Sequence, residues 1–142
     1  MNNKQPIAYV ICGFIGAGKT TFARKLEKET KAIRITKDEW IIKIFGNKIT
    51  LDKNFAEYDK RLTQLAKDFA FKILQSGGDV IIDEGFWVKS QRDALKIRIK
   101  EAGAEPILYY VKCKDKWDNY PGNAINAVQC TAIINPYDVP EI

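Results

Sequence analysis

Short apolar runs alternate along the chain with longer segments in which apolar residues recur every three or four positions. Nearly continuous apolar runs are typical of strands buried on both faces of a parallel sheet. They predict strands at 7–12, 32–35, 79–83, 107–111 and, more weakly patterned, 131–134. The alternation of strands and helices favours an α/β fold with a mostly parallel sheet of four to five strands flanked by helices.

The helices between these strands are predicted from apolar periodicity together with start and stop residues. The expected helices are 19–30, 36–46, 55–73 and 90–103. The second has two candidate N-caps, Thr36 and Asp38, and Gly46 ends it. Ser90 is the expected N-cap of the fourth. The third shows the clearest periodicity, and a glycine pair closes it.

Composition limits the classes of protein that this chain can belong to. With 142 residues, 46% apolar and 29% charged, it matches an ordinary globular protein with one core. No apolar run approaches the roughly 20 residues that cross a membrane. The short apolar run 7–12 leads into a glycine-rich motif and not a cleavage site, so it predicts a strand and a cytoplasmic protein without membrane contact.

Charge and the rarer residue types narrow the chemistry further. The net charge of +5 suits anionic substrates, but it is equally compatible with a solvated surface. The sequence has no histidine, which excludes Ser-His-Asp hydrolysis and histidine-bound zinc. Three widely separated cysteines favour ordinary buried thiols over a disulfide framework or a zinc site.

The strongest motif follows the first predicted strand, where Gly13–Thr20 matches the pattern G-x-x-x-x-G-K-[ST]. Glycines let successive backbone N–H groups point at one phosphate, and the following helix adds its positive end. Lys19 is then expected to bind the β- and γ-phosphates of ATP, and Thr20 to ligate Mg²⁺. The residues expected to hold the nucleotide are Gly13, Phe14, Ile15, Gly16, Ala17, Gly18, Lys19, Thr20 and Thr21.

Two carboxylates lie where ligands of a doubly wound sheet are expected, beyond the carboxyl ends of strands. Asp83 ends the third strand and is the second expected Mg²⁺ residue, with a turn or N-cap role as the less favoured alternative. Asp38 is the candidate general base, with a plain N-cap as the alternative. Arg92 is the third candidate catalytic residue beside Lys19 and Asp38, unless it is a solvated helix residue.

Together these motifs resemble the small kinase-like P-loop proteins of the AAA type, which include the polynucleotide kinase domain, chloramphenicol phosphotransferase and zeta-toxin-type kinases. The resemblance rests on the segments 13–21, 35–40, 80–87 and 107–113, and it covers roughly residues 7–114. It implies a three-layer P-loop NTPase fold and ATP with Mg²⁺ as ligands. It also implies that Asp38 contacts the acceptor hydroxyl and that Arg92 lies near the substrate.

The sequence departs from this family after the fourth strand. Such kinases usually carry an arginine-containing lid there, whereas the last arginine of this chain is Arg98 and the last lysine is Lys116. We therefore expect a kinase-like core at 1–116 and an atypical segment, a degenerate lid or a tail, at 117–142.

The leading hypothesis is an ATP-dependent phosphotransferase that acts on a hydroxyl of a small molecule. A nucleotide-binding protein with little turnover and a 5′-hydroxyl nucleic-acid kinase are the alternatives, and Glu84 beside Asp83 keeps an ATP hydrolase open. A GTPase is disfavoured because 47–50 lacks the aspartate of N-K-x-D and Phe86 occupies the glycine position of D-x-x-G. The acceptor and the oligomeric state stay open.

Overall fold

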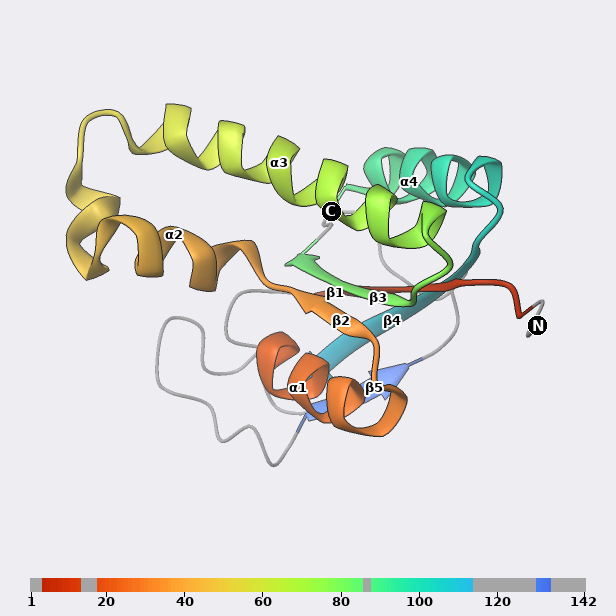
Figure 1. The fold of residues 1–142 in the computed structure, drawn as a ribbon. Coiled ribbons are helices and arrows are strands. Elements are labelled where there is room, and N and C mark those ends of the chain that lie inside the picture. The colour runs from red at the N-terminus through yellow and green to blue at the C-terminus, as the bar shows by residue number, and fades with distance from the viewer. Residues whose placement is uncertain (1–3, 14–17, 86–87, 114–129, 134–142) are drawn as a thin grey trace.

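The computed structural model describes residues 4–13, 18–85, 88–113 and 130–133. Within them the chain forms a five-stranded sheet with the order β2-β3-β1-β4-β5 (Figure 1). Its strands are β1 (Ile7–Cys12), β2 (Ile33–Ile35), β3 (Val80–Gly85), β4 (Glu105–Cys113) and β5 (Cys130–Ile133). Strands β1 to β4 are parallel to one another, and β5 is antiparallel to β4. The predicted mostly parallel α/β sheet is confirmed.

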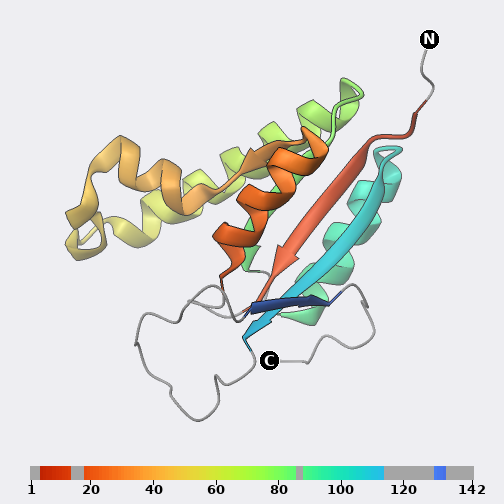
Figure 2. The same ribbon diagram turned by 90° about the horizontal axis from the view of Figure 1, so that it is seen from below.

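Helices cover both faces of this sheet. They are α1 (Lys19–Thr30), α2 (Lys37–Phe45), α3 (Phe55–Gln75) and α4 (Lys89–Glu101), with the 3-10 helix η1 (Asn47–Leu51) between α2 and α3. One face carries α1, and the other carries α3 and α4 (Figures 1 and 2). The result is the three-layer arrangement that the P-loop motif predicts.

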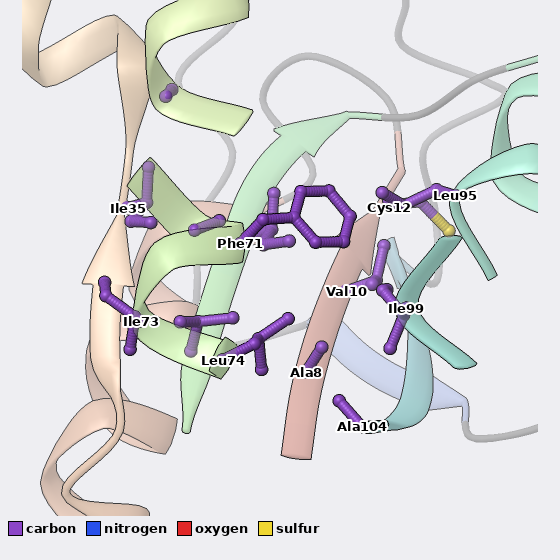
Figure 3. Close-up of a cluster of buried hydrophobic side chains, with 14 of the residues drawn as sticks. Ala8, Val10, Cys12, Ile35, Phe71, Ile73, Leu74, Leu95, Ile99 and Ala104 are labelled. Atoms are coloured by element: carbon purple, nitrogen blue, oxygen red, sulfur yellow. The ribbon is translucent and has the colours of Figure 1, made fainter. Parts of the chain in front are cut away.

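Strand alternation divides the apolar side chains between two cores. Alternate residues of β1 and β3 point to opposite faces, so Val80 and Ile82 face α3 and α4 while Ile81 faces α1. The larger core lies between the sheet and the pair α3 and α4 (Figure 3). The labelled members of this core are Ala8, Val10, Cys12, Ile35, Phe71, Ile73, Leu74, Leu95, Ile99 and Ala104. Burial on both faces explains the nearly continuous apolar runs in the sequence.

A third, smaller cluster lies outside both of these cores. Ile41, Ile49 and Leu62 are buried together where α2, η1 and the first turns of α3 meet. We call this part of the molecule, residues 37–62, the arm. Both ribbon views show it extending beyond the sheet (Figures 1 and 2).

Most predicted element boundaries agree with the structure, and the differences have local causes. The predicted strand 7–12 and helix 19–30 are reproduced by β1 and α1, while β4 is longer than the predicted 107–111. Thr36 is the N-cap of α2, so Asp38 lies within its first turn. Ser90 as an N-cap is wrong, because α4 begins at Lys89 and the carbonyl of Val88 accepts the first helical N–H bonds.

Across the part of the chain that the structure describes, no helix combines the length and the apolar character that a membrane crossing requires. Segment 117–142 contributes β5 to the sheet, and the rest of that segment lies outside the described residues. The predicted boundary at residue 116 therefore stays a prediction.

Candidate active site

The polar residues that the sequence singled out converge at the carboxyl ends of the parallel strands. Asp83, in β3, is only 4% exposed. Its Oδ2 accepts a hydrogen bond from Thr20 Oγ1 at 3.0 Å and another from Thr36 Oγ1 at 3.3 Å. These three side chains come from β3, α1 and the turn after β2, so the fold joins distant parts of the chain at one carboxylate.

Several neighbours influence the charge of Asp83. Burial raises the pKa of its carboxyl above the ordinary value. The hydrogen bond from Thr20, the positive charge of Lys19 and the hydrogen bond from Thr36 all oppose that rise, and the negative charge of Asp38 adds to it. The two hydroxyl donors and the nearby lysine favour the ionised form of the carboxyl, which is the form that can bind a cation.

Gly13 and Gly18, which lie on either side of the undescribed part of the glycine-rich motif, both have a positive φ. Gly13 has φ 149°, and a Cβ placed there would lie 2.5 Å from the carbonyl oxygen of Val111 in β4. Gly18 has φ 91° and is the N-cap of α1. Lys19 and Thr20 then occupy the first turn of α1, and both are half-buried. The first turn of a helix concentrates unpaired backbone N–H groups, which bind anions.

The remaining motif residues are placed as follows. Thr21 is exposed on α1. Residues Phe14, Ile15, Gly16 and Ala17 lie outside the described residues. Phe86 and Trp87, which follow β3, also lie outside them.

Gly13→Ala is expected to destabilise the protein by about 1–3 kcal/mol, because the added methyl group would meet the Val111 carbonyl and the backbone would be strained. Chemical denaturation monitored by circular dichroism measures this loss. Gly77→Ala is the matched control, since Gly77 has φ 88° but nothing within 4 Å of the added Cβ. It should lose only the roughly 1 kcal/mol of left-handed strain. Equal losses in the two variants would contradict the close approach at Gly13.

Asp38 lies at the same end of the sheet as Asp83 but is open to solvent. Its side chain is 83% exposed, and its Oδ1 lies 3.9 Å from Lys37 Nζ. Its negative charge contributes to the raised pKa of both Asp83 and Glu84. Because Thr36 is the N-cap, the alternative role of Asp38 as an N-cap is wrong. An exposed carboxylate beside the buried one is accessible to a second ligand.

Arg92 is buried, with 7% exposure, so its reading as a solvated helix residue is wrong. It lies in the first turns of α4 and its positive charge acts on Cys12 and Tyr110, which are paired in β1 and β4. Burial raises the pKa of the Cys12 thiol to about 11, despite the opposing charges of Arg92 and Lys19. The thiol is therefore protonated, as expected of an ordinary core cysteine.

Glu84 faces the opposite side of the sheet from Asp83. The alternation along β3 turns its side chain toward the face that carries α3. Its Oε1 is buried and has no hydrogen-bond partner among the described residues. Burial raises the pKa of this carboxyl, while Lys67 and Lys37 oppose the rise. The sequence singled out Glu84 only as the partner of Asp83 in a D-E pair and did not reveal its unpaired oxygen.

The side chains of Thr20 and Asp83 suit Mg²⁺, which keeps water and phosphate ligands, better than they suit a metal ion that is bound only by protein side chains. Among the described residues, no group of three or more His, Cys, Asp and Glu side chains is placed to hold a metal ion. Thr20 and Asp83 instead offer one hydroxyl and one carboxylate. Mg²⁺ is commonly bound by one or two such oxygens together with water and substrate phosphates. These two residues fit that ion.

Comparison with known proteins identifies the family. Residues 9–117 match the family model described as an AAA domain, which is more than half of the chain. The chain belongs to this family. The match extends from β1 beyond β4 and includes the glycine-rich motif, Asp38, Asp83 and Arg92. The expected resemblance to kinase-like P-loop proteins of the AAA type is confirmed.

Individual relatives of this AAA-family domain agree with that assignment. The chain is 29% identical over 130 residues to a shikimate kinase from Caldicellulosiruptor saccharolyticus. The matched region covers 78% of this chain and 72% of the relative. The PezAT chromosomal toxin–antitoxin system of Streptococcus pneumoniae is similar in structure, with TM-score 0.62 and 24% identity over 76% of this chain. The Pnkp1/Rnl/Hen1 complex has TM-score 0.58 and 23% identity over 78% of this chain.

The two solved structures establish the fold and nothing finer, because their identities are low. The matched region spans 47% of the PezAT chain and 36% of the Pnkp1/Rnl/Hen1 chain. This AAA-family domain therefore corresponds to less than half of either solved chain.

Proposed function

We propose that this AAA-family domain is an ATP-dependent phosphotransferase that moves the γ-phosphoryl group of ATP to a hydroxyl of a small molecule. The observation that carries the proposal is the contact between Thr20 and the buried Asp83, beside Lys19 at the start of α1. The match to the family and the similarity to a shikimate kinase support kinase chemistry.

The nucleotide would be bound by the residues from Gly13 to Thr21. Lys19 and the N–H groups at the start of α1 bind the β- and γ-phosphates, and Thr20 and Asp83 hold Mg²⁺. When bound, Mg²⁺ neutralises charge on the transferred phosphoryl group. Arg92 would supply a further positive charge, since it is buried in α4 near Cys12 and Tyr110, at the ends of β1 and β4.

Asp38 would serve the acceptor. The acceptor hydroxyl oxygen bonds to the γ-phosphorus, the bond from that phosphorus to the β–γ bridging oxygen breaks, and ADP leaves. Asp38 accepts the hydroxyl proton as the bond forms. Its exposure and its position beside Asp83 allow a second ligand to reach it.

The acceptor is the least constrained part of the proposal. The similarity to a shikimate kinase makes shikimate the first candidate to assay. A 5′-hydroxyl oligonucleotide is the alternative, supported by the net charge of +5 and by the fold shared with the Pnkp1/Rnl/Hen1 complex. The lack of arginine after Arg98 favours a third reading, a nucleotide-binding protein with little turnover.

Calorimetric titration of ATP and GTP, with and without Mg²⁺, tests the proposal. We expect binding that prefers ATP and strengthens with Mg²⁺, followed by phosphoryl transfer to one member of an acceptor panel. Tight ATP binding without transfer to any acceptor would favour the protein with little turnover. The absence of binding for both nucleotides would overturn the proposal.

A further inference from the structure

We propose that Arg34 and Thr36 are positioning residues that hold the Asp83 carboxylate in place for Mg²⁺. The inference rests on the proposed function and adds to it two residues outside the nucleotide-binding motifs. It is carried by a continuous chain of hydrogen bonds that runs from the surface of the molecule to the buried carboxylate.

The direction of the hydrogen bonds along this chain is unambiguous. Arg34 Nη1 donates to Thr36 Oγ1 at 2.6 Å, and a guanidinium group can only donate. The single proton of the Thr36 hydroxyl is then left for Asp83 Oδ2, 3.3 Å away. Arg34 therefore orients the Thr36 hydroxyl, and that hydroxyl orients the carboxylate.

Arg34 is itself held on two sides. Its Nε donates to Glu27 Oε1 at 3.3 Å, and its Nη1 donates to Glu39 Oε2 at 3.0 Å. Glu39 Oε1 accepts a further bond from Arg24 Nη2 at 2.6 Å. The Arg34 side chain is 15% exposed, whereas that of Glu27 is 41% exposed and that of Arg24 is 58% exposed, so the network runs from the surface to a largely buried guanidinium group. Three elements, α1, β2 and α2, thus fix one guanidinium group behind Thr36.

The Thr36 hydroxyl is not used for helix capping. Thr36 is the N-cap of α2, where a threonine oxygen ordinarily accepts a backbone N–H, yet its side chain makes no capping hydrogen bond. The backbone carbonyl of Thr36 accepts from the N–H groups of Glu39 and Trp40 instead. Thr36 is 3% exposed, and its hydroxyl donates to the carboxylate of Asp83. A purely local role in starting the helix does not explain that geometry.

Thr36→Val removes the hydroxyl and retains the shape of the side chain, whereas Thr36→Ser retains the hydroxyl. The measured quantity is the ratio of ATP affinities with and without Mg²⁺, obtained by calorimetric titration. We expect Thr36→Val to reduce this ratio about 10-fold, as for one lost hydrogen bond to a charged group, and to leave Mg²⁺-free ATP binding unchanged. Thr36→Ser should keep the wild-type ratio.

Thr63→Val is the matched control, because the Thr63 hydroxyl bonds to the Asp59 carbonyl within α3, far along the chain from the site. It should leave the ratio unchanged. A wild-type ratio in Thr36→Val would overturn the inference, as would an equal loss of binding with and without Mg²⁺. If Thr36→Val does not fold, Arg34→Gln decides: a reduced ratio supports the inference and an unchanged ratio overturns it.

The same titrations separate this inference from the proposed function. If wild-type protein shows no Mg²⁺-dependent ATP binding, the proposed function itself fails. If wild-type protein shows that dependence and Thr36→Val matches it, only the role of Arg34 and Thr36 fails.

Discussion

Lys19→Ala is expected to abolish detectable ATP binding. Lys19 begins α1, and its positive charge acts on both Asp83 and Cys12, so it lies close to the buried carboxylate. Lys19 is expected to pair with the phosphates of ATP. Removing one partner of a buried charge pair costs about 2–5 kcal/mol, or roughly 30- to 5,000-fold in affinity. Calorimetric titration of ATP with Mg²⁺ measures the loss.

Lys25→Ala is the matched control for Lys19→Ala. Lys25 lies on the same helix, with an exposed side chain at 4.0 Å from Glu29. The variant should bind ATP as the wild type does, since an exposed pair contributes little. Unchanged affinity in Lys19→Ala would refute the phosphate-binding role of the glycine-rich motif.

Asp38→Asn is expected to abolish phosphoryl transfer while leaving ATP binding intact. The amide cannot accept the acceptor proton, and general base catalysis contributes about 10²- to 10⁴-fold. Among the described residues, the exposed side chain of Asp38 has one ion-pair approach, to Lys37 at 3.9 Å, so we expect its replacement to leave the fold intact. Transfer to the acceptor found by screening is measured beside calorimetric ATP affinity.

Asp68→Asn is the control for this change, because Asp68 is an exposed carboxylate of α3 that accepts a hydrogen bond only one helical turn away, from Gln64. It should leave both transfer and ATP affinity at wild-type levels. If transfer survives in Asp38→Asn, Asp38 is not the base.

The parts of the fold that the sequence predicted best are those where local pattern and tertiary packing agree. The run 7–12 is apolar throughout because β1 is the central strand and is covered on both faces. The glycine motif that follows it marks the start of α1 at Lys19. Sequence alone was therefore sufficient for the strand and the helix that flank the glycine-rich motif.

Features that depend on distant contacts could not be predicted. Thr36 and Asp38 were equally good N-caps by residue type, and the structure places the cap at Thr36, whose carbonyl accepts the N–H groups of Glu39 and Trp40. The burial of Arg92 arises from its position over the ends of β1 and β4, which a helix pattern does not encode. Arg34 was missed because its partners lie on α1 and α2 and its strand position carried no motif.

The arm is the part of the described structure that we expect to unfold locally most easily. Its core contains three buried apolar residues, Ile41, Ile49 and Leu62, whereas the core under α3 and α4 is several times larger. Separating the arm from the domain therefore costs less free energy than unfolding the sheet. Such sub-global opening would displace the segment beginning near Asp38, whereas Lys19 and Asp83 lie outside that segment, on α1 and β3. Under the proposed function, the acceptor side of the site would thus open more easily than the strand and helix that carry Asp83 and Lys19.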